Sequence, residues 1–109
     1  MKRFETKFAT TTARATAVAL GKSVRNARVA RGWSRQELAE RAKSSQPTLQ
    51  RLEAGGVEVA MGTWLSVMDV LGMLTQLRLD ALHDPVAEKL LDQTRAKRPI
   101  RPSAKDLDF

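Results

Sequence analysis

Four polar side chains in one short stretch carry the functional groups that recognise the edges of DNA bases. They are Gln46, Thr48, Gln50 and Arg51. Amide and guanidinium groups form paired hydrogen bonds with adenine and guanine respectively, and a hydroxyl group can bond to several bases. A helix surface that merely faces water more often carries Lys and Glu. We therefore expect these residues to read bases, the alternative being an ordinary helical hairpin with a polar face.

The first element needed to position these side chains is a helix that begins after Ser34. Ser34 and Glu37 have the spacing of a capping box, in which each side chain bonds to the other residue's backbone amide. Leu38, Ala39 and Ala42 then form one narrow apolar stripe.

A second helix is expected to begin after Ser45, which is a good N-cap. Pro47 falls in the first turn, where proline is tolerated because the amide has no acceptor within the helix. Leu49 and Leu52 would bury the inner face, and Gly55 would end the helix in the left-handed conformation. Two short helices joined by a tight turn, the second with a polar outer face, predict a helix-turn-helix.

The charge of the chain agrees with a polyanionic partner. The 109 residues have a net charge of +7, and residues 1–31 alone contain eight Lys or Arg and one Glu. Residues 60–96 contain three basic and five acidic residues. The basic end suits nucleic acid, and the acidic segment is expected to face away from it.

Residues 20–74 resemble the Xre/Cro type of bacterial and phage repressor domain. The resemblance rests on the motifs Leu-Gly at 20–21, Gly-Trp-Ser at 32–34, Gln-Glu-Leu-Ala at 36–39 and the Leu49-to-Gly55 stretch, with the arginines of 25–28. It implies an all-α fold, a compact bundle of five helices that is usually dimeric on DNA. Here we expect an added C-terminal helix and flexible tails. Pro47 departs from the family pattern, because that position often carries an amide that reads bases.

The same resemblance assigns roles to individual residues. It implies that Gln46, Thr48, Gln50 and Arg51 read bases and that Arg35 touches phosphate. It also implies that Glu53 braces the domain through an ion pair, with Arg28 or Arg25 as its partner. The full set of phosphate contacts that we expect is Ser34, Arg35, Lys43, Ser45, Lys22 and Arg25.

A narrower resemblance concerns residues 61–65 and 70–74, which are Met-Gly-Thr-Trp-Leu and Val-Leu-Gly-Met-Leu. With the basic tail, they are similar to HipB-type antitoxins. That resemblance implies an operon shared with a HipA-like Ser/Thr kinase toxin, which this chain would repress and bind. One alternative is an interaction subunit whose first task is to neutralise the toxin. Another is a phage-type or metabolic Xre regulator without a toxin.

The predicted organisation is an N-terminal arm (1–12), a helix-turn-helix domain (13–74), a helical extension (75–96) and a flexible basic tail (97–109). The arm could be disordered or pair as a strand with a partner, and the tail could cover DNA, dock on a partner or remain free. Helices are expected at about 13–31, 61–71 and 85–95. Residues 74–82 fit a helix better than a strand. Their leucines suggest a two-fold dimer interface made by Leu74, Leu77, Leu79 and Leu82.

Catalysis, metal binding and cofactors are not expected. The chain has no cysteine and one histidine, and its Gly-Gly pair is not followed by the Lys-Ser/Thr of a phosphate-binding loop. No apolar run approaches the roughly 20 residues that span a bilayer. We expect a cytoplasmic, nucleoid-associated bacterial protein that binds double-stranded DNA at inverted repeats as a homodimer.

Overall fold

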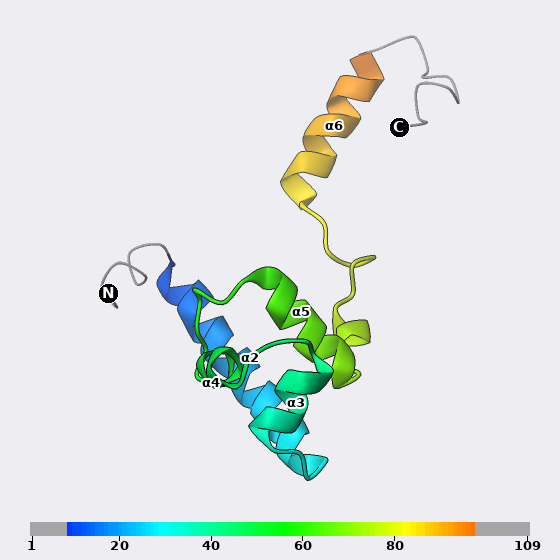
Figure 1. Ribbon diagram of the computed structural model, residues 1–109. Helices are drawn as coiled ribbons and strands as arrows, with labels where there is room; N and C mark the ends of the chain where they lie inside the picture. The colour runs from blue at the N-terminus through cyan, green and yellow to red at the C-terminus, as the bar shows by residue number, and fades with distance from the viewer. Residues whose placement is uncertain (1–8, 98–109) are drawn as a thin grey trace. The chain divides into compact units, whose positions relative to one another are not determined.

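The computed structural model describes residues 9–97, and within that range the chain is helical, with no strand. The elements are α2 (Thr11–Ala30), α3 (Arg35–Arg41), α4 (Gln46–Glu53), α5 (Met61–Val70), the 3-10 turn η1 (Leu74–Gln76) and α6 (Pro85–Lys97). Figure 1 shows these elements along the chain. The expected all-α fold is confirmed. The expectations for residues 1–8 and 98–109 lie outside the described range.

Helix α3 begins after Ser34 as predicted, whereas α2 begins at Thr11, two residues before the expected start at about residue 13. Glu37 N donates to Ser34 Oγ at 3.1 Å, and Ser34 N donates to Glu37 Oε1 at 3.0 Å, which completes the capping box of α3. Hydrogen bonds from the backbone and hydroxyl of Ser34 hold the pKa of the Glu37 carboxyl below its usual value. This contribution to stability is present above the ordinary pKa of glutamate and is lost as the pH falls through the lowered value.

Helix α4 starts and ends as the sequence predicts. Thr48 N donates to Ser45 Oγ at 3.2 Å, and Pro47 occupies the first turn. At the other end Gly55 has a φ of 84°, the left-handed conformation that ends a helix without strain only in glycine.

The core lies where α2, α3, α4 and α5 meet, and it contains Leu38, Leu49 and Leu52, which the helical periodicity of α3 and α4 placed inward. Helix α4 packs on both α2 and α3, and α3 also packs on α5; Figure 1 shows α4 nearly end-on beside α2. Burying one large apolar side chain stabilises the fold by roughly 1.5–3 kcal/mol relative to leaving it exposed to water. The largest fully buried side chains are Leu38, Leu49, Leu52, Leu71, Val24 and Val67.

Helices α2 and α4 approach each other closely at Gly21. A Cβ atom at this position would lie 2.5 Å from the carbonyl oxygen of Leu52 and 2.8 Å from that of Glu53. Both atoms are backbone, so they cannot move aside as a side chain would. Because Gly21 has no side chain, α4 can pack closely against α2 at this position.

The prediction of a helix over residues 74–82 is wrong. Only Leu74–Gln76 is helical, as a 3-10 turn, and the chain then runs through turns to Asp84. Within it Arg78 bonds to Asp80 through Nε–Oδ1 at 3.0 Å and Nη2–Oδ2 at 2.8 Å, and this guanidinium lowers the pKa of the Asp80 carboxyl. An ion pair two residues apart belongs to a turn, since such residues do not face each other on a helix.

The chain divides into two compact units, the first ending at Leu77 and the second beginning at Arg78. The second unit contains α6, which begins after Asp84 as predicted. The Oδ1 atom of Asp84 accepts from the amide of Val86 at 3.1 Å. Val86, Leu90 and Leu91 of α6 are all exposed.

Candidate nucleic-acid interface

Helix α4 presents opposite chemistry on its two faces. Leu49, Leu52 and Glu53 are buried, whereas the residues expected to read bases point outward or lie at the edge of that surface. Of these, Gln46, Gln50 and Arg51 are exposed and Thr48 is half-buried. The four predicted base-reading side chains thus all belong to the part of α4 that is not buried, which we call the α4 outer face.

Three residues of this region form a chain of hydrogen bonds. Ser45 Oγ donates to Thr48 Oγ1 at 2.8 Å, and Arg51 Nη2 donates to the same oxygen at 3.3 Å. The hydroxyl oxygen of Thr48 is therefore an acceptor for two neighbours, and its own hydrogen is the group left to donate outward. Because one side chain orients the next, Thr48 and Arg51 present their donors as a unit.

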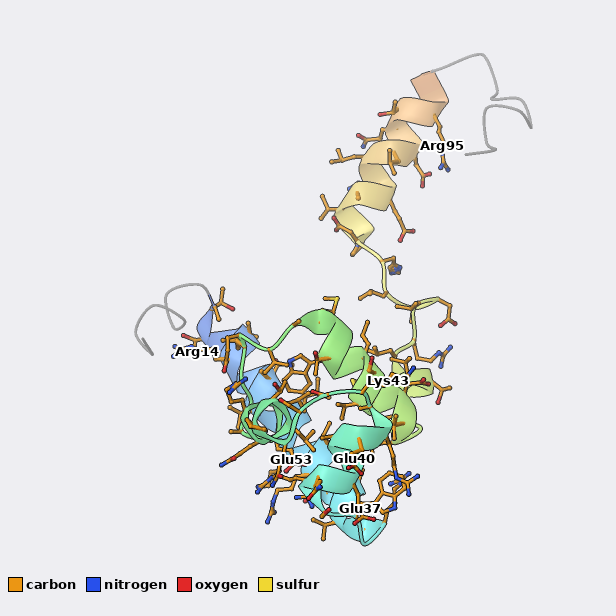
Figure 2. The ribbon with its side chains drawn as sticks, in the orientation of Figure 1. Arg14, Glu37, Glu40, Lys43, Glu53 and Arg95 are labelled. Carbon is orange, nitrogen blue, oxygen red and sulfur yellow. The ribbon has the colours of Figure 1, made fainter. Side chains whose placement is uncertain are left out.

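The residues expected to contact phosphate differ in their exposure and in the hydrogen bonds that they already make. Lys22 and Arg25 are exposed on α2. Lys43, labelled in Figure 2, is exposed in the turn between α3 and α4. Ser34 and Ser45 are also exposed, and both already serve as N-caps. An N-cap hydroxyl accepts a backbone hydrogen bond and keeps its hydrogen for a phosphate oxygen. Ser45, however, already donates that hydrogen to Thr48 Oγ1.

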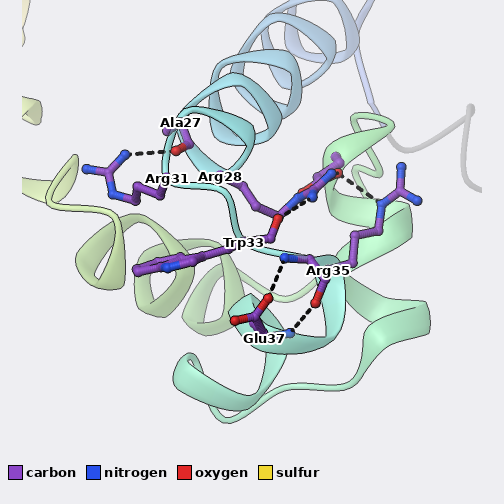
Figure 3. A network of polar contacts seen from close by, with 8 residues as sticks. Ala27, Arg28, Arg31, Trp33, Arg35 and Glu37 are labelled. Carbon is purple, nitrogen blue, oxygen red and sulfur yellow. Dashed lines mark hydrogen bonds and ion pairs between the residues drawn. The ribbon is translucent and has the colours of Figure 1, made fainter.

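Glu53 is held by two arginines beneath the α4 outer face. Arg28 Nε donates to Glu53 Oε2 at 2.7 Å and Arg28 Nη2 to Oε1 at 3.1 Å, while Arg35 Nε donates to Oε1 at 3.1 Å. Figure 3 shows Arg28 and Arg35 converging on this network. The side chains of Arg28 and Glu53 are 10% and 2% exposed. Of the two partners that the sequence left open for Glu53, the structure selects Arg28.

The hydrogen bond that Arg35 makes to Glu53 must be considered together with its expected contact to a DNA phosphate. Its Nε atom is bonded to Glu53, yet its side chain remains 38% exposed. A guanidinium can bridge a carboxylate and a phosphate, because its five N–H groups point in several directions. The structure thus places Arg35 between the buried carboxylate and the surface.

Trp33 lies half-buried against the core, and two arginines flank its ring. The guanidinium carbon of Arg41 is 4.3 Å from the ring centroid and that of Arg31 is 5.9 Å away. Arg31 also donates to the carbonyl oxygen of Ala27 at 2.8 Å, as Figure 3 shows. It donates to the carbonyl oxygen of Leu71 at 2.8 Å as well, and so closes the C-terminal ends of α2 and α5. This bracing by Arg31 was missed from sequence, because Leu71 lies 40 residues further along the chain.

The four leucines proposed as a dimer interface do not share one environment. Leu74 packs against the core and is partly buried, whereas Leu77, Leu79 and Leu82 are exposed. Leu74 belongs to the first unit's own packing. The other three are exposed apolar side chains in the turns before α6.

Lys43 occupies a conformation that ordinarily favours glycine. Its φ is 56°, and it is the only residue other than glycine with positive φ in the described part of the chain. Ser44 N bonds to the carbonyl of Ala39 at 2.8 Å and Lys43 N to that of Glu40 at 3.2 Å, the pattern of a Schellman motif. A cation is thus held at a strained position in the turn that leads to α4.

We expect Lys43→Gly and Lys43→Ala to weaken DNA binding equally and to flatten its salt dependence by about one, since each removes one phosphate contact. Only Lys43→Gly should also raise the free energy of unfolding, by up to about 1 kcal/mol, because it relieves the left-handed strain. Binding titrations at several salt concentrations and urea unfolding measure the two effects. Unchanged salt slopes in both variants would remove Lys43 from the phosphate contacts.

No group of three or more His, Cys, Asp or Glu side chains in residues 9–97 could hold a metal ion. Over the same range, no helix combines the length and apolar character needed to cross a membrane.

A capped helix, a tight turn and a second helix with a polar outer face define the helix-turn-helix class of DNA-binding transcriptional regulators. Residues 19–82 match the helix-turn-helix domain family, and the chain belongs to that family. Neither the comparison with curated proteins nor that with solved structures gives a significant match. Proteins of this family are typically not enzymes.

Proposed function

We propose that the protein is a sequence-specific repressor that binds inverted-repeat operators as a homodimer. The observation that carries the proposal is the α4 outer face, where Gln46, Thr48, Gln50 and Arg51 gather above a buried brace. In this proposal residues 13–74 form the DNA-binding domain and residues 75–96 the dimerisation or partner extension. Two copies of α4 would enter successive major grooves about 34–36 Å apart.

The dimer would use exposed apolar side chains outside the core. Leu77, Leu79 and Leu82 are exposed before α6, and Leu90 and Leu91 are exposed on it. Large exposed apolar clusters on a small domain usually mark an interaction surface.

We further propose that the protein is the antitoxin and autoregulator of an operon with a HipA-like Ser/Thr kinase toxin. Support comes from the resemblance of residues 61–65 and 70–74 to HipB-type antitoxins. A second candidate function is an interaction subunit that chiefly neutralises a toxin, and the exposed apolar residues of α6 favour it. Co-purification with the product of the neighbouring gene would distinguish this candidate from a regulator without a toxin.

The test is a footprint of the full-length protein on DNA upstream of its own gene, with excess non-specific competitor. A protected inverted repeat, with half-sites one or two helical turns apart, would support a repressor dimer. Analytical ultracentrifugation of the same sample should show two protein chains per operator. Salt-sensitive coating without a discrete site would instead mean that α4 does not read sequence unaided, and the interaction subunit would become the leading proposal.

Arg51→Ala tests the base-reading role directly. We expect it to cost about 1–3 kcal/mol of operator binding and to relax specificity at one base pair, as for an arginine paired with guanine. Competition binding against operators changed at each base pair would measure the loss. Gln36→Ala is a matched control, because this residue is exposed on α3 outside the α4 outer face. Equal weakening of Arg51→Ala at every sequence would make Arg51 a phosphate contact.

A further inference from the structure

An acidic side chain lies beside the α4 outer face, where a surface that binds DNA would be expected to avoid negative charge. Glu58 belongs to the loop between α4 and α5, and its Oε2 atom lies 3.9 Å from Arg51 Nε. The side chain of Glu58 is 30% exposed and that of Arg51 is 52% exposed. The pair is therefore partly shielded from water and lies next to a residue proposed to read bases.

The place of the Glu58 carboxylate depends on a glycine. A Cβ atom at position 56 would lie 2.7 Å from Glu58 Oε1 and 2.9 Å from Oε2. The carboxylate thus fills the space that any other residue at Gly56 would occupy, next to the turn that follows α4. It lies close to the backbone at Gly56, although the residue as a whole is exposed.

Arg51 is consequently contacted on two edges of its guanidinium. Its Nε edge faces Glu58, and its Nη2 atom donates to Thr48 Oγ1 at 3.3 Å. A guanidinium has five N–H groups, so the Nη1 pair and one Nη2 hydrogen remain to form a two-pronged donor. That is the geometry with which arginine binds the O6 and N7 atoms of guanine.

The negative charge of Glu58 has different effects on the two contacts that Arg51 could make with DNA, one to a phosphate and one to a base edge. A phosphate that approaches Arg51 meets the neighbouring carboxylate, and like charges repel at this range. A base edge carries neutral acceptors and meets no such opposition. Glu58 therefore penalises a backbone contact more than a base contact.

We propose that Glu58 is a positioning residue that determines specificity, because it aims Arg51 at a base edge and disfavours its use on phosphates. The proposal rests on the base-reading role of Arg51 proposed above. It predicts that removing the charge of Glu58 has opposite effects on the two kinds of DNA. Affinity for random duplex should rise, and the ratio of operator to random-duplex affinity should fall.

The experiment compares full-length wild type with Glu58→Gln on two probes, at several salt concentrations. One probe is an operator selected from randomised DNA by the wild-type protein, and the other is a random duplex of the same length. Asp69→Asn is the matched control, because it removes the same charge from an exposed position on α5. Both changes are repeated in the Arg51→Ala background.

We expect Glu58→Gln to lower the affinity ratio about fivefold, the upper range for a partly exposed ion pair. Its salt slope on random duplex should steepen by up to one. Asp69→Asn should leave the ratio unchanged, and in the Arg51→Ala background the two variants should behave alike. Thermal melting of each variant separates these effects from loss of fold.

Two results would overturn the proposal while leaving the repressor function intact. One is a Glu58→Gln ratio equal to that of Asp69→Asn. The other is an undiminished effect of Glu58→Gln without Arg51, which would mean that Glu58 acts on DNA directly. If wild type itself fails to select an operator or to prefer it over random duplex, the proposed function fails, and the role of Glu58 fails with it.

Discussion

Glu53→Gln should lower the free energy of unfolding by about 3–5 kcal/mol, the usual cost of breaking a buried ion pair from one side. The Arg28 side chain is 10% exposed and would keep its charge without the carboxylate that now accepts two of its hydrogen bonds. A chain of this size has a total stability of roughly 5–15 kcal/mol. The variant should therefore be largely unfolded in urea concentrations that leave wild type folded.

Urea unfolding followed by circular dichroism and by tryptophan fluorescence measures this loss. Arg35→Ala is the matched control, because Arg35 bonds to the same carboxylate and yet is 38% exposed. Arg35→Ala should lower the free energy of unfolding by no more than about 1 kcal/mol, as expected for an ion-pair partner that is exposed to water. Replacing Arg28 and Glu53 together, by Met and Leu, should recover much of the loss, because no unpaired charge stays buried. A loss below 1 kcal/mol for Glu53→Gln would contradict the assignment of this pair as a structural brace.

Gly21→Ala should destabilise the domain by about 3 kcal/mol, the upper end of the range for overpacking. Alanine ordinarily stabilises a helix relative to glycine by about 1 kcal/mol, so the sign here is reversed. The reason is the 2.5 Å approach of a Cβ atom to the Leu52 carbonyl oxygen, which only a shift of α4 can relieve. Since α4 carries the base-reading residues, operator affinity should fall as well.

Gly62→Ala provides the control for this experiment. Gly62 lies in α5, and a Cβ atom there would meet nothing within 4 Å. The same chemical change should therefore stabilise the protein, by a few tenths to about 1 kcal/mol. Thermal unfolding of both variants tests the pair of predictions. Equal shifts in the same direction would show that helix propensity, and not the approach of α4 to α2, dominates at Gly21.

The helix-turn-helix could be predicted because its start and stop signals are local. Ser34, Glu37 and Ser45 act within one helical turn of their partners, and Gly55 adopts its conformation by its own nature. Such signals need no knowledge of the rest of the fold. They fix where α3 and α4 begin and end, and with them which residues face outward.

Contacts between distant segments could be predicted only in part. Glu53 was expected to pair with Arg28 or Arg25, and the choice depends on how α2 lies against α4, which sequence spacing does not give. Glu58 and Arg51 are brought together by the loop after α4. No periodic pattern relates them, so the sequence offered no signal for that pair.

The error at residues 74–82 has a different physical cause. Leu74, Leu77 and Ala81 have helical spacing, but Leu77 and Ala81 are exposed, so no core stabilises an amphipathic helix there. A short helix without such packing is marginal in water. The Arg78–Asp80 pair stabilises turns instead. Helical periodicity identifies the residues that a helix would bury, but it does not show whether another element packs against that apolar face.

The two faces of α4 also have an evolutionary consequence. Its inner face is tied to α2 and α3 by Leu49, Leu52 and the Glu53 brace, whereas Gln46 and Gln50 are exposed. Surface substitutions of this kind usually change stability by less than about 0.5 kcal/mol. In the proposed function, a duplicated gene could therefore acquire a new operator through a few codon changes, without passing through an unfolded intermediate sequence.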